Sequence, residues 1–176
     1  MGCDIHTYVE YRKRNLPKDA REYEKQWRSF TPRINPGRNY MLFALLASVR
    51  GDYPQSLKPK GMPKEKPGYY AERNNQCYIS ETSNEEGCVT LETAQRWATY
   101  GCKIINDKEG KPTWVTHPDW HSHSWLTTRQ YAKVLKIYET MPDNWGGVLE
   151  YEALLAMMRY FEKKGYKARI VFWFDN

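Results

Sequence analysis

The C-terminal segment 167–175, KARIVFWFD, decides the fold of this chain. Apolar residues fill nearly every position from Ala168 to Phe174, a pattern typical of a central strand that is covered on both faces. A second strand is predicted near the opposite end of the chain, in residues 3–12, CDIHTYVEYR. Both chain ends are therefore expected to be strands.

Residues 3–12 alternate between two kinds of side chain, which indicates a half-buried strand. One face carries Cys3, Ile5, Thr7 and Val9, and the other carries Asp4, His6, Tyr8 and Glu10. Because the second face is polar and ionisable, this strand is a candidate to line a ligand pocket.

Helices and short strands are expected between the two chain ends. Residues 38–50, RNYMLFALLASVR, are apolar around most of a helical circumference and stop at Gly51, which predicts a buried helix. Thr127 and Gln130 fit a capping box, so a further helix is predicted directly after the segment HSHSWL. The other predicted elements are strands at 26–31, 103–106 and 113–116, and helices at 90–100 and 149–164.

The order of these elements predicts an α+β fold. We expect a mixed β-sheet that includes both the N- and C-terminal strands, packed by about three to four helices on one face. The 176 residues have the length of one domain, so residues 1–176 are predicted to form a single domain. Residues 52–68 are rich in Pro and Lys without periodicity, which indicates a long loop of the kind that often carries function.

Composition favours an anionic partner. The 27 Lys and Arg exceed the 21 Asp and Glu, which suits nucleotides, phosphates or nucleic acid and is also typical of a soluble surface with excess Lys. The seven Trp and fourteen Tyr suit wet pockets and interfaces, so a homo-oligomer stays open. The four Cys show no C-x-x-C pair, and no secretory or transmembrane run is visible. We therefore expect a cytoplasmic protein with reduced thiols and no membrane partner.

The histidines are the first candidates for chemistry. His6 shares its strand face with Asp4, and His117, His121 and His123 lie just ahead of the capped helix. In an extended segment, His121 and His123 point to the same side. Asp4, His6, His121 and His123 then form a candidate divalent-metal set, because imidazole and carboxylate ligands suit Zn, Mn or Fe. The alternative is a metal-free, hydrogen-bonded polar cluster, and the sequence assigns no cofactor.

The same histidines allow a hydrolase hypothesis. His6, His121 and His123 would transfer protons to and from a phosphodiester, with or without a metal, while basic residues hold the charge. The segment 121–124 departs from the His-x-Ser/Thr spacing of two-histidine phosphoesterases, since each Ser directly follows a His. A serine nucleophile is disfavoured because the chain has no G-x-S-x-G elbow.

Binding without turnover is another hypothesis. Phosphates can pair with Arg33, Arg38, Arg50 and Lys60, and a base can stack on Tyr40, Trp120 or Trp125. The same residues also suit a solvated rim and core aromatics. The ligand site predicted from all these patterns comprises Asp4, His6, Arg38, Asn39, Tyr40, Arg50, His121, His123 and Trp125.

Four sequence blocks span nearly the whole chain. They are MGCDIH with the following Glu10, RNYMLFALLASVRG with a downstream GMP, HSHSWLT, and RIVFWFDN. In combination they resemble a family of small proteins found in phages and bacterial genomes. The resemblance implies a shared fold but no particular activity. It also implies a common site formed by Asp4, His6, Arg38, Asn39, Arg50, His121, His123 and Trp125.

Net charge, arginine placement and aromatic content make capture of a phosphate-containing nucleotide the leading hypothesis, and the phage-type resemblance suggests a signal of host defence as that nucleotide. Such a protein would sequester a cyclic oligonucleotide or a cyclic ADP-ribose isomer in the host cytosol and so evade host defence. Capture needs only tight phosphate and base contacts, whereas the alternative phosphodiesterase needs groups poised against a transition state. A nucleic-acid or protein-binding module ranks third, and would use the Lys- and Arg-rich regions 12–28 and 58–66.

Overall fold

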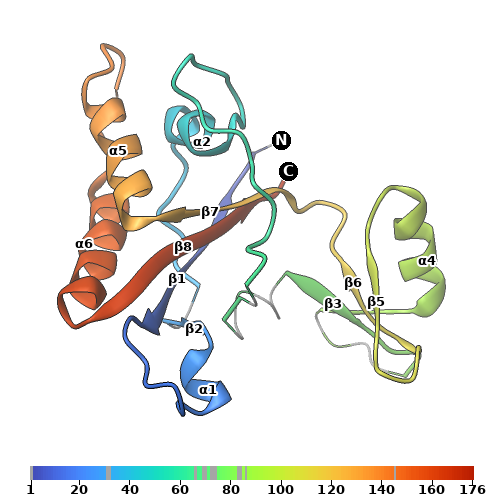
Figure 1. Cartoon of the computed structure of the whole chain (residues 1–176). Coiled ribbons are helices and arrows are strands. Elements are labelled where there is room, and N and C mark those ends of the chain that lie inside the picture. Colours follow the sequence, from blue (N-terminus) through green and yellow to red (C-terminus); the bar gives the residue numbers. More distant parts are fainter. Residues whose placement is uncertain are drawn as a thin grey trace.

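The two chain ends lie side by side at the centre of a four-stranded antiparallel sheet, sheet A, in the computed structural model (Figure 1). Its strand order is β2 (Arg28–Ser29), β1 (Ile5–Lys13), β8 (Tyr166–Phe174) and β7 (His121–Thr127). Strands β1 and β8 pair along their whole lengths, from Ile5 opposite Phe174 to Lys13 opposite Tyr166. The structure describes residues 2–30, 33–65, 67–68, 71, 75–82, 85, 87–144 and 146–176. The predicted α+β class, with both terminal strands in one sheet, is confirmed.

Three helices cover one face of sheet A (Figure 1). They are α2 (Tyr40–Ala47), α5 (Thr128–Glu139) and α6 (Leu149–Lys163). Asn39 starts α2 by accepting a hydrogen bond from the Leu42 amide, and Thr127 and Gln130 form the capping box that starts α5. The helices bury their apolar side chains against Ile5 and Val9 of β1 and against alternate residues of β8. No helix in the described part of the chain is long and apolar enough to cross a bilayer.

A second, smaller sheet, sheet B, lies beside sheet A (Figure 1). Its order is β4 (Cys88–Val89), β3 (Gln76–Ile79), β6 (Pro112–Thr116) and β5 (Ile104–Asn106), and α4 (Leu91–Thr99) packs on it. The β5–β6 pair confirms the strands predicted at 103–106 and 113–116. Strands β3 and β4, and the single turn α1 (Glu22–Lys25), were not predicted. Among the described residues, Cys77, Ala94 and Val115 form the buried centre of this unit.

The other face of sheet A is crossed by residues 61–65 and 67–68, here called the crossing segment. Gly61 donates its amide to the His123 carbonyl at 2.8 Å, and Gly68 donates its amide to Glu10. Between these two ties, Met62 packs on a cluster around Tyr8 and Trp173. Residues 61–65 and 67–68 of the predicted loop therefore cover β8 from the side opposite the helices, which explains why residues 168–174 are all buried. Tyr53 and Leu57, earlier in the same loop, pack on the helix-covered side.

Candidate functional site

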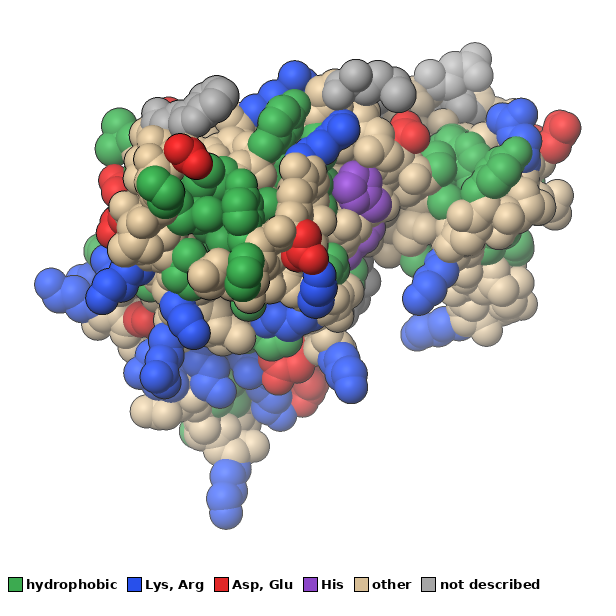
Figure 2. Space-filling model, turned by 90° about the horizontal axis from the view of Figure 1, so that it is seen from above, with side chains coloured by type: hydrophobic (Ala, Val, Ile, Leu, Met, Phe, Trp, Pro, Cys, Tyr) green, Lys and Arg blue, Asp and Glu red, His purple; other side chains and the backbone are tan. Residues whose placement is uncertain are grey.

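An open cleft of about 910 Å³ separates the polar face of β1 from sheet B. Strand β1 and sheet B both line it, together with α4 and residues between the strands. The lining includes His6, Tyr8, Arg33, Cys77, Tyr78, Trp97, Trp114, His117 and Trp120. Figure 2 shows histidine side chains at the surface where the two lobes of the molecule meet. The volume lies in the range of small-molecule sites, about 300–1,000 Å³.

The imidazole of His6 is held in one tautomer by its two neighbours. Its Nδ1 lies 2.7 Å from Arg33 Nη1, and its Nε2 lies 2.9 Å from Asp175 Oδ2. Because a guanidinium can only donate, Nδ1 must accept, and Nε2 carries the proton that is donated to Asp175. Burial lowers the pKa of His6, and Arg33 lowers it further against the opposing effect of Asp175. His6 is therefore neutral at pH 7, with both ring nitrogens engaged.

Arg33 is an exposed cation at the cleft. Among the described residues its side chain forms one hydrogen bond, to the neutral ring of His6, and no ion pair within 4.0 Å. A guanidinium has five N–H donors in a planar fork, which suits bidentate contact with a phosphate or carboxylate. The arrangement leaves most of these donors for an anion that enters the cleft.

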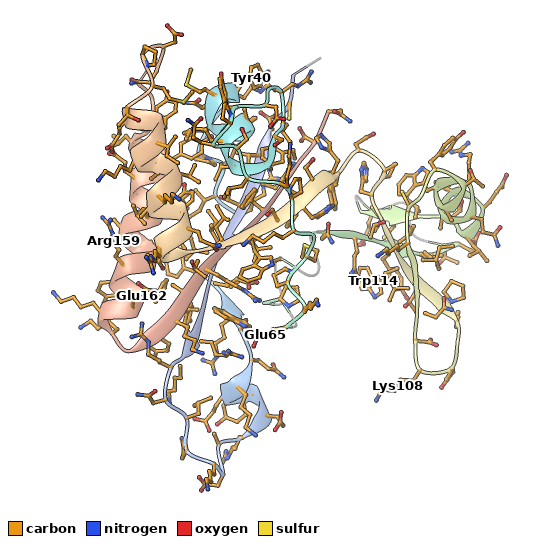
Figure 3. The ribbon with its side chains drawn as sticks, turned by 45° about the horizontal axis from the view of Figure 1, so that its top comes forward. Tyr40, Glu65, Lys108, Trp114, Arg159 and Glu162 are labelled. Carbon is orange, nitrogen blue, oxygen red and sulfur yellow. The ribbon has the colours of Figure 1, made fainter. Side chains whose placement is uncertain are left out.

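Aromatic rings form the walls of the cleft. His117 stacks on Trp120 with ring centroids 4.7 Å apart and meets the edge of Trp97 at 5.2 Å. Across sheet B, Tyr78 meets Trp114 at 5.1 Å, and Figure 3 labels Trp114 on the side of sheet B that faces sheet A. Burial lowers the pKa of His117, and its Nδ1 accepts the Asp119 amide at 3.2 Å. These walls offer flat surfaces on which a planar ligand can stack.

Behind the cleft lies Trp173, whose side chain is fully buried. Its ring centroid lies within 6.0 Å of the rings of His6, Tyr8, His123 and Trp120. In the described part of the molecule its Nε1–H has no hydrogen-bond partner. The indole is the rigid centre that fixes His6 and Trp120 relative to each other.

Asp4 and Arg38 form an ion pair beside the cleft. Arg38 donates to both Asp4 carboxylate oxygens, and Asp4 donates its amide to Asp175 at 2.7 Å. The hydrogen bond from Arg38 lowers the pKa of Asp4. Of the nine residues predicted as a ligand site, Asp4, His6 and Arg38 thus lie near one another through Asp175, but only His6 lines the cleft.

The other residues predicted near α2 have local roles. Asn39 caps the helix and donates to Tyr138 Oη at 2.9 Å. Tyr40 packs edge-on against Phe43, and the guanidinium of Arg50 lies 6.0 Å from the Tyr40 ring centroid. None of these three residues lines the cleft.

A β-bulge in β7 separates His121 from His123. Ser122 has φ 53, in the left-handed region, and the register between β7 and β8 shifts at this point. His121 therefore stacks on Phe174, on the helix-covered face, whereas His123 stacks on Trp173, on the opposite face. The prediction that the two histidines point to the same side is wrong, because it assumed a regular strand.

The predicted metal set is not brought together. Within the residues that the structure describes, no group of three or more His, Cys, Asp and Glu side chains is arranged to hold a metal ion. Asp4 is paired with Arg38, His6 contacts Asp175, and His123 Nε2 lies 2.5 Å from Asn75 Oδ1. The side chain of the fourth member, His121, lies on the other face of the sheet.

Several cleft residues were missed as site residues by sequence reasoning. Arg33 and Trp120 were recognised as suited to phosphate and base, but His117, Trp97 and Trp114 were not placed with them. Their aromatic character was visible in the sequence. Their convergence depends on sheet B, two strands of which are too short to leave a periodic pattern.

Comparisons of the chain with protein-family models, with curated proteins and with solved structures found no match. No relative therefore supplies a function. The inference has to rest on the geometry and charge of the cleft.

Proposed function

We propose that the protein binds a nucleotide in the cleft between sheets A and B and does not turn it over. The observation that carries this proposal is Arg33, an exposed cation beside aromatic walls whose one hydrogen bond, within the described residues, is to a neutral imidazole. A phosphate can pair with the remaining guanidinium N–H groups. The base can stack on the rings of the cleft walls, foremost Trp120 and Trp114.

The charge of the cleft favours a ligand with much ring surface per phosphate. Counting the described lining residues, Arg33 is the one permanent cation and Glu85 the one carboxylate, while His6 and His117 have lowered pKa values. A nucleoside triphosphate would bring more negative charge than this lining can neutralise. A cyclic oligonucleotide or a cyclic ADP-ribose isomer, which carries fewer charges per ring, suits the cleft better.

The hydrogen bonds of His6 and His123 favour binding over catalysis. A general base needs a ring nitrogen that can reach the substrate, but both nitrogens of His6 already contact Arg33 and Asp175. His123 contacts Asn75, and burial with the nearby histidines lowers its pKa to about 4. Binding without turnover would let the protein sequester a nucleotide immune signal, the role expected of a phage-type protein that evades host defence. The alternative, a phosphodiesterase that uses His6, His121 and His123, would require these contacts to rearrange.

The test is to incubate the protein with a panel of cyclic oligonucleotides and cyclic ADP-ribose isomers and to chromatograph the free ligand before and after heat denaturation. We expect depletion of a panel member and its intact recovery on heating. The appearance of new products would show that the protein hydrolyses the nucleotide and does not sequester it. If no member of the panel were depleted, the proposal would be refuted.

Two Arg variants locate the site. Arg33→Ala should weaken binding of the captured nucleotide by about tenfold to a hundredfold, the effect of losing a charge-assisted hydrogen bond. The matched control is Arg159→Ala, which removes an exposed Arg of α6, labelled in Figure 3, that does not line the cleft. Equal affinities of the two variants would show that the nucleotide binds elsewhere.

A further inference from the structure

A second hollow, here called the lysine groove, lies at the other end of the polar face of sheet A. Its volume is about 560 Å³, and it lies between the crossing segment and the ends of β1, β7 and β8. No described residue lines both the groove and the cleft. The groove is therefore a separate candidate site and does not depend on the proposed function.

Two regions that are far apart in the sequence meet in this groove. Arg12 and Trp27 come from the Lys- and Arg-rich region 12–28, whereas Lys60 and Lys64 come from region 58–66. Lys167 joins them from the start of β8. Sequence reasoning offered both regions to a nucleic acid, but only the fold places them on one surface.

The lining carries an excess of positive charge. Its described residues include five cationic side chains, Arg12, Lys60, Lys64, Lys167 and Arg169, against the two carboxylates Glu65 and Glu162. Glu65, labelled in Figure 3, already accepts a hydrogen bond from Trp27 Nε1 at 2.7 Å and lies 3.4 Å from Arg12 Nη2. Arg169 forms an ion pair with the buried Glu10, with its Nε 2.7 Å from Glu10 Oε2.

The three lysines of the groove, Lys60, Lys64 and Lys167, are exposed. They form no ion pair with any described residue. Lys60 lies with its Nζ 4.1 Å from the Trp125 ring centroid and 3.2 Å from Gln130 Oε1, both uncharged partners. Burial lowers its pKa, and no carboxylate opposes that effect. Apart from the pairs that involve Glu65 and Glu10, three lysines converge here against one carboxylate, Glu162, among the described lining residues. Such an excess of cations is the electrostatic footprint of a phosphate-rich ligand.

We infer that the lysine groove binds the phosphate backbone of a single-stranded nucleic acid. The groove is concave, whereas reading a duplex requires an element that protrudes into the DNA groove. Trp125, which is partly exposed, adds aromatic surface against which sugars and unstacked bases can pack. Lys60, Lys64 and Lys167 supply the phosphate contacts.

The test compares two triple variants by fluorescence anisotropy with a short labelled single strand at several salt concentrations. The first variant combines Lys60→Ala, Lys64→Ala and Lys167→Ala and should weaken binding at least about tenfold. Log K falls as log salt rises, and this dependence should become less steep by about 2, because each phosphate contact on a single strand contributes about 0.7 to the steepness. The control combines Lys18→Ala, Lys108→Ala and Lys111→Ala, which remove the same charge from exposed positions outside the groove. We expect the control to bind like the parent within about twofold.

Three outcomes would overturn the inference. They are failure of the parent to bind the strand, equal loss of affinity in both triple variants, and equal or tighter binding of the same strand after annealing to its complement. Arg33→Ala separates this site from the cleft, since it should leave strand binding intact. If Arg33→Ala abolished strand binding, the strand would bind in the cleft and the lysine groove would be excluded as its site.

Discussion

The same two strands, β1 and β8, carry an ionisable pair at each end of one sheet face. At the first end, His6 contacts Asp175 and is open to the cleft. At the second end, Glu10 lies directly opposite Arg169, and both side chains are buried, with exposed fractions of 0% and 3%. The crossing segment covers the second pair through Gly68 and Glu65. At the first pair His6 is also buried, but it lines the cleft, and the side chain of its partner Asp175 is 28% exposed. The covered pair stabilises the fold, whereas the first pair holds His6, and through it Arg33, at the wall of an open cleft.

The largest expected effect is at the covered end. Arg169→Met leaves the Glu10 carboxylate buried without its cation, which should lower the free energy of unfolding by about 3–5 kcal/mol. Urea denaturation measures this loss. The control is Lys25→Met, which breaks the exposed pair with Glu22 and should cost less than about 1 kcal/mol. If Arg169→Met lowered the free energy of unfolding as little as Lys25→Met, the Glu10–Arg169 pair would not stabilise the fold.

A smaller loss is expected where the crossing segment approaches β2. A Cβ at Gly68 would clash with the Ser29 backbone nitrogen, so Gly68→Ala should destabilise the protein by about 1–3 kcal/mol. The comparison variant is Gly51→Ala, where the nearest atom, the Ala44 Cβ, is 3.2 Å away. We expect a lower melting temperature for Gly68→Ala than for Gly51→Ala. The reverse order would show that the crossing segment is loosely held.

The stability of the protein should also depend on pH through His123, which stacks on Trp173 behind the cleft. Burial, followed by the nearby histidines, lowers the pKa of His123 to about 4 from 6.5. Between these values the unfolded chain binds a proton that the native protein does not, so His123 contributes stability above pH 6.5 that is lost as the pH falls toward 4. Because His123 is partly exposed, we expect a contribution of about 1–2 kcal/mol. Urea titrations of the parent and of His123→Gln across this range should show a flatter profile for the variant, and identical profiles would contradict the assignment.

The smallest effect is expected from Arg38→Ala. Its charge is neutralised by Asp4, unlike that of Arg33, so nucleotide affinity should change by less than about twofold. Isothermal titration calorimetry with the nucleotide captured from the panel measures this. A loss as large as that of Arg33→Ala would extend the binding site to the Asp4–Arg38 pair and restore the site first predicted from sequence.

The sequence predicted the elements whose pattern repeats over many residues. The alternation of residues 3–12 and the apolar run 167–175 correspond to β1 and β8, and the capping box at Thr127 begins α5. The long helix predicted at 149–164 corresponds to α6. These signals are local, because burial follows the period of the strand or helix itself.

The sequence could not show the bulge at Ser122 or the two-residue strand β4, since neither leaves a periodic signal. It offered both Arg33 and Arg38 as possible phosphate partners but placed only Arg38 in the predicted ligand site. Only the tertiary structure paired Arg38 with Asp4 and left Arg33 beside the neutral His6.

The sequence by itself determined which residues carry charge, aromatic surface and strand or helix periodicity. The tertiary structure decided which of them meet. It brought His117 and Trp114 of the second lobe to the open end of sheet A, and it brought Lys60 and Lys167 together at the covered end. The physical reason is that a local pattern fixes the face on which a side chain lies, while long-range packing fixes what that face opposes.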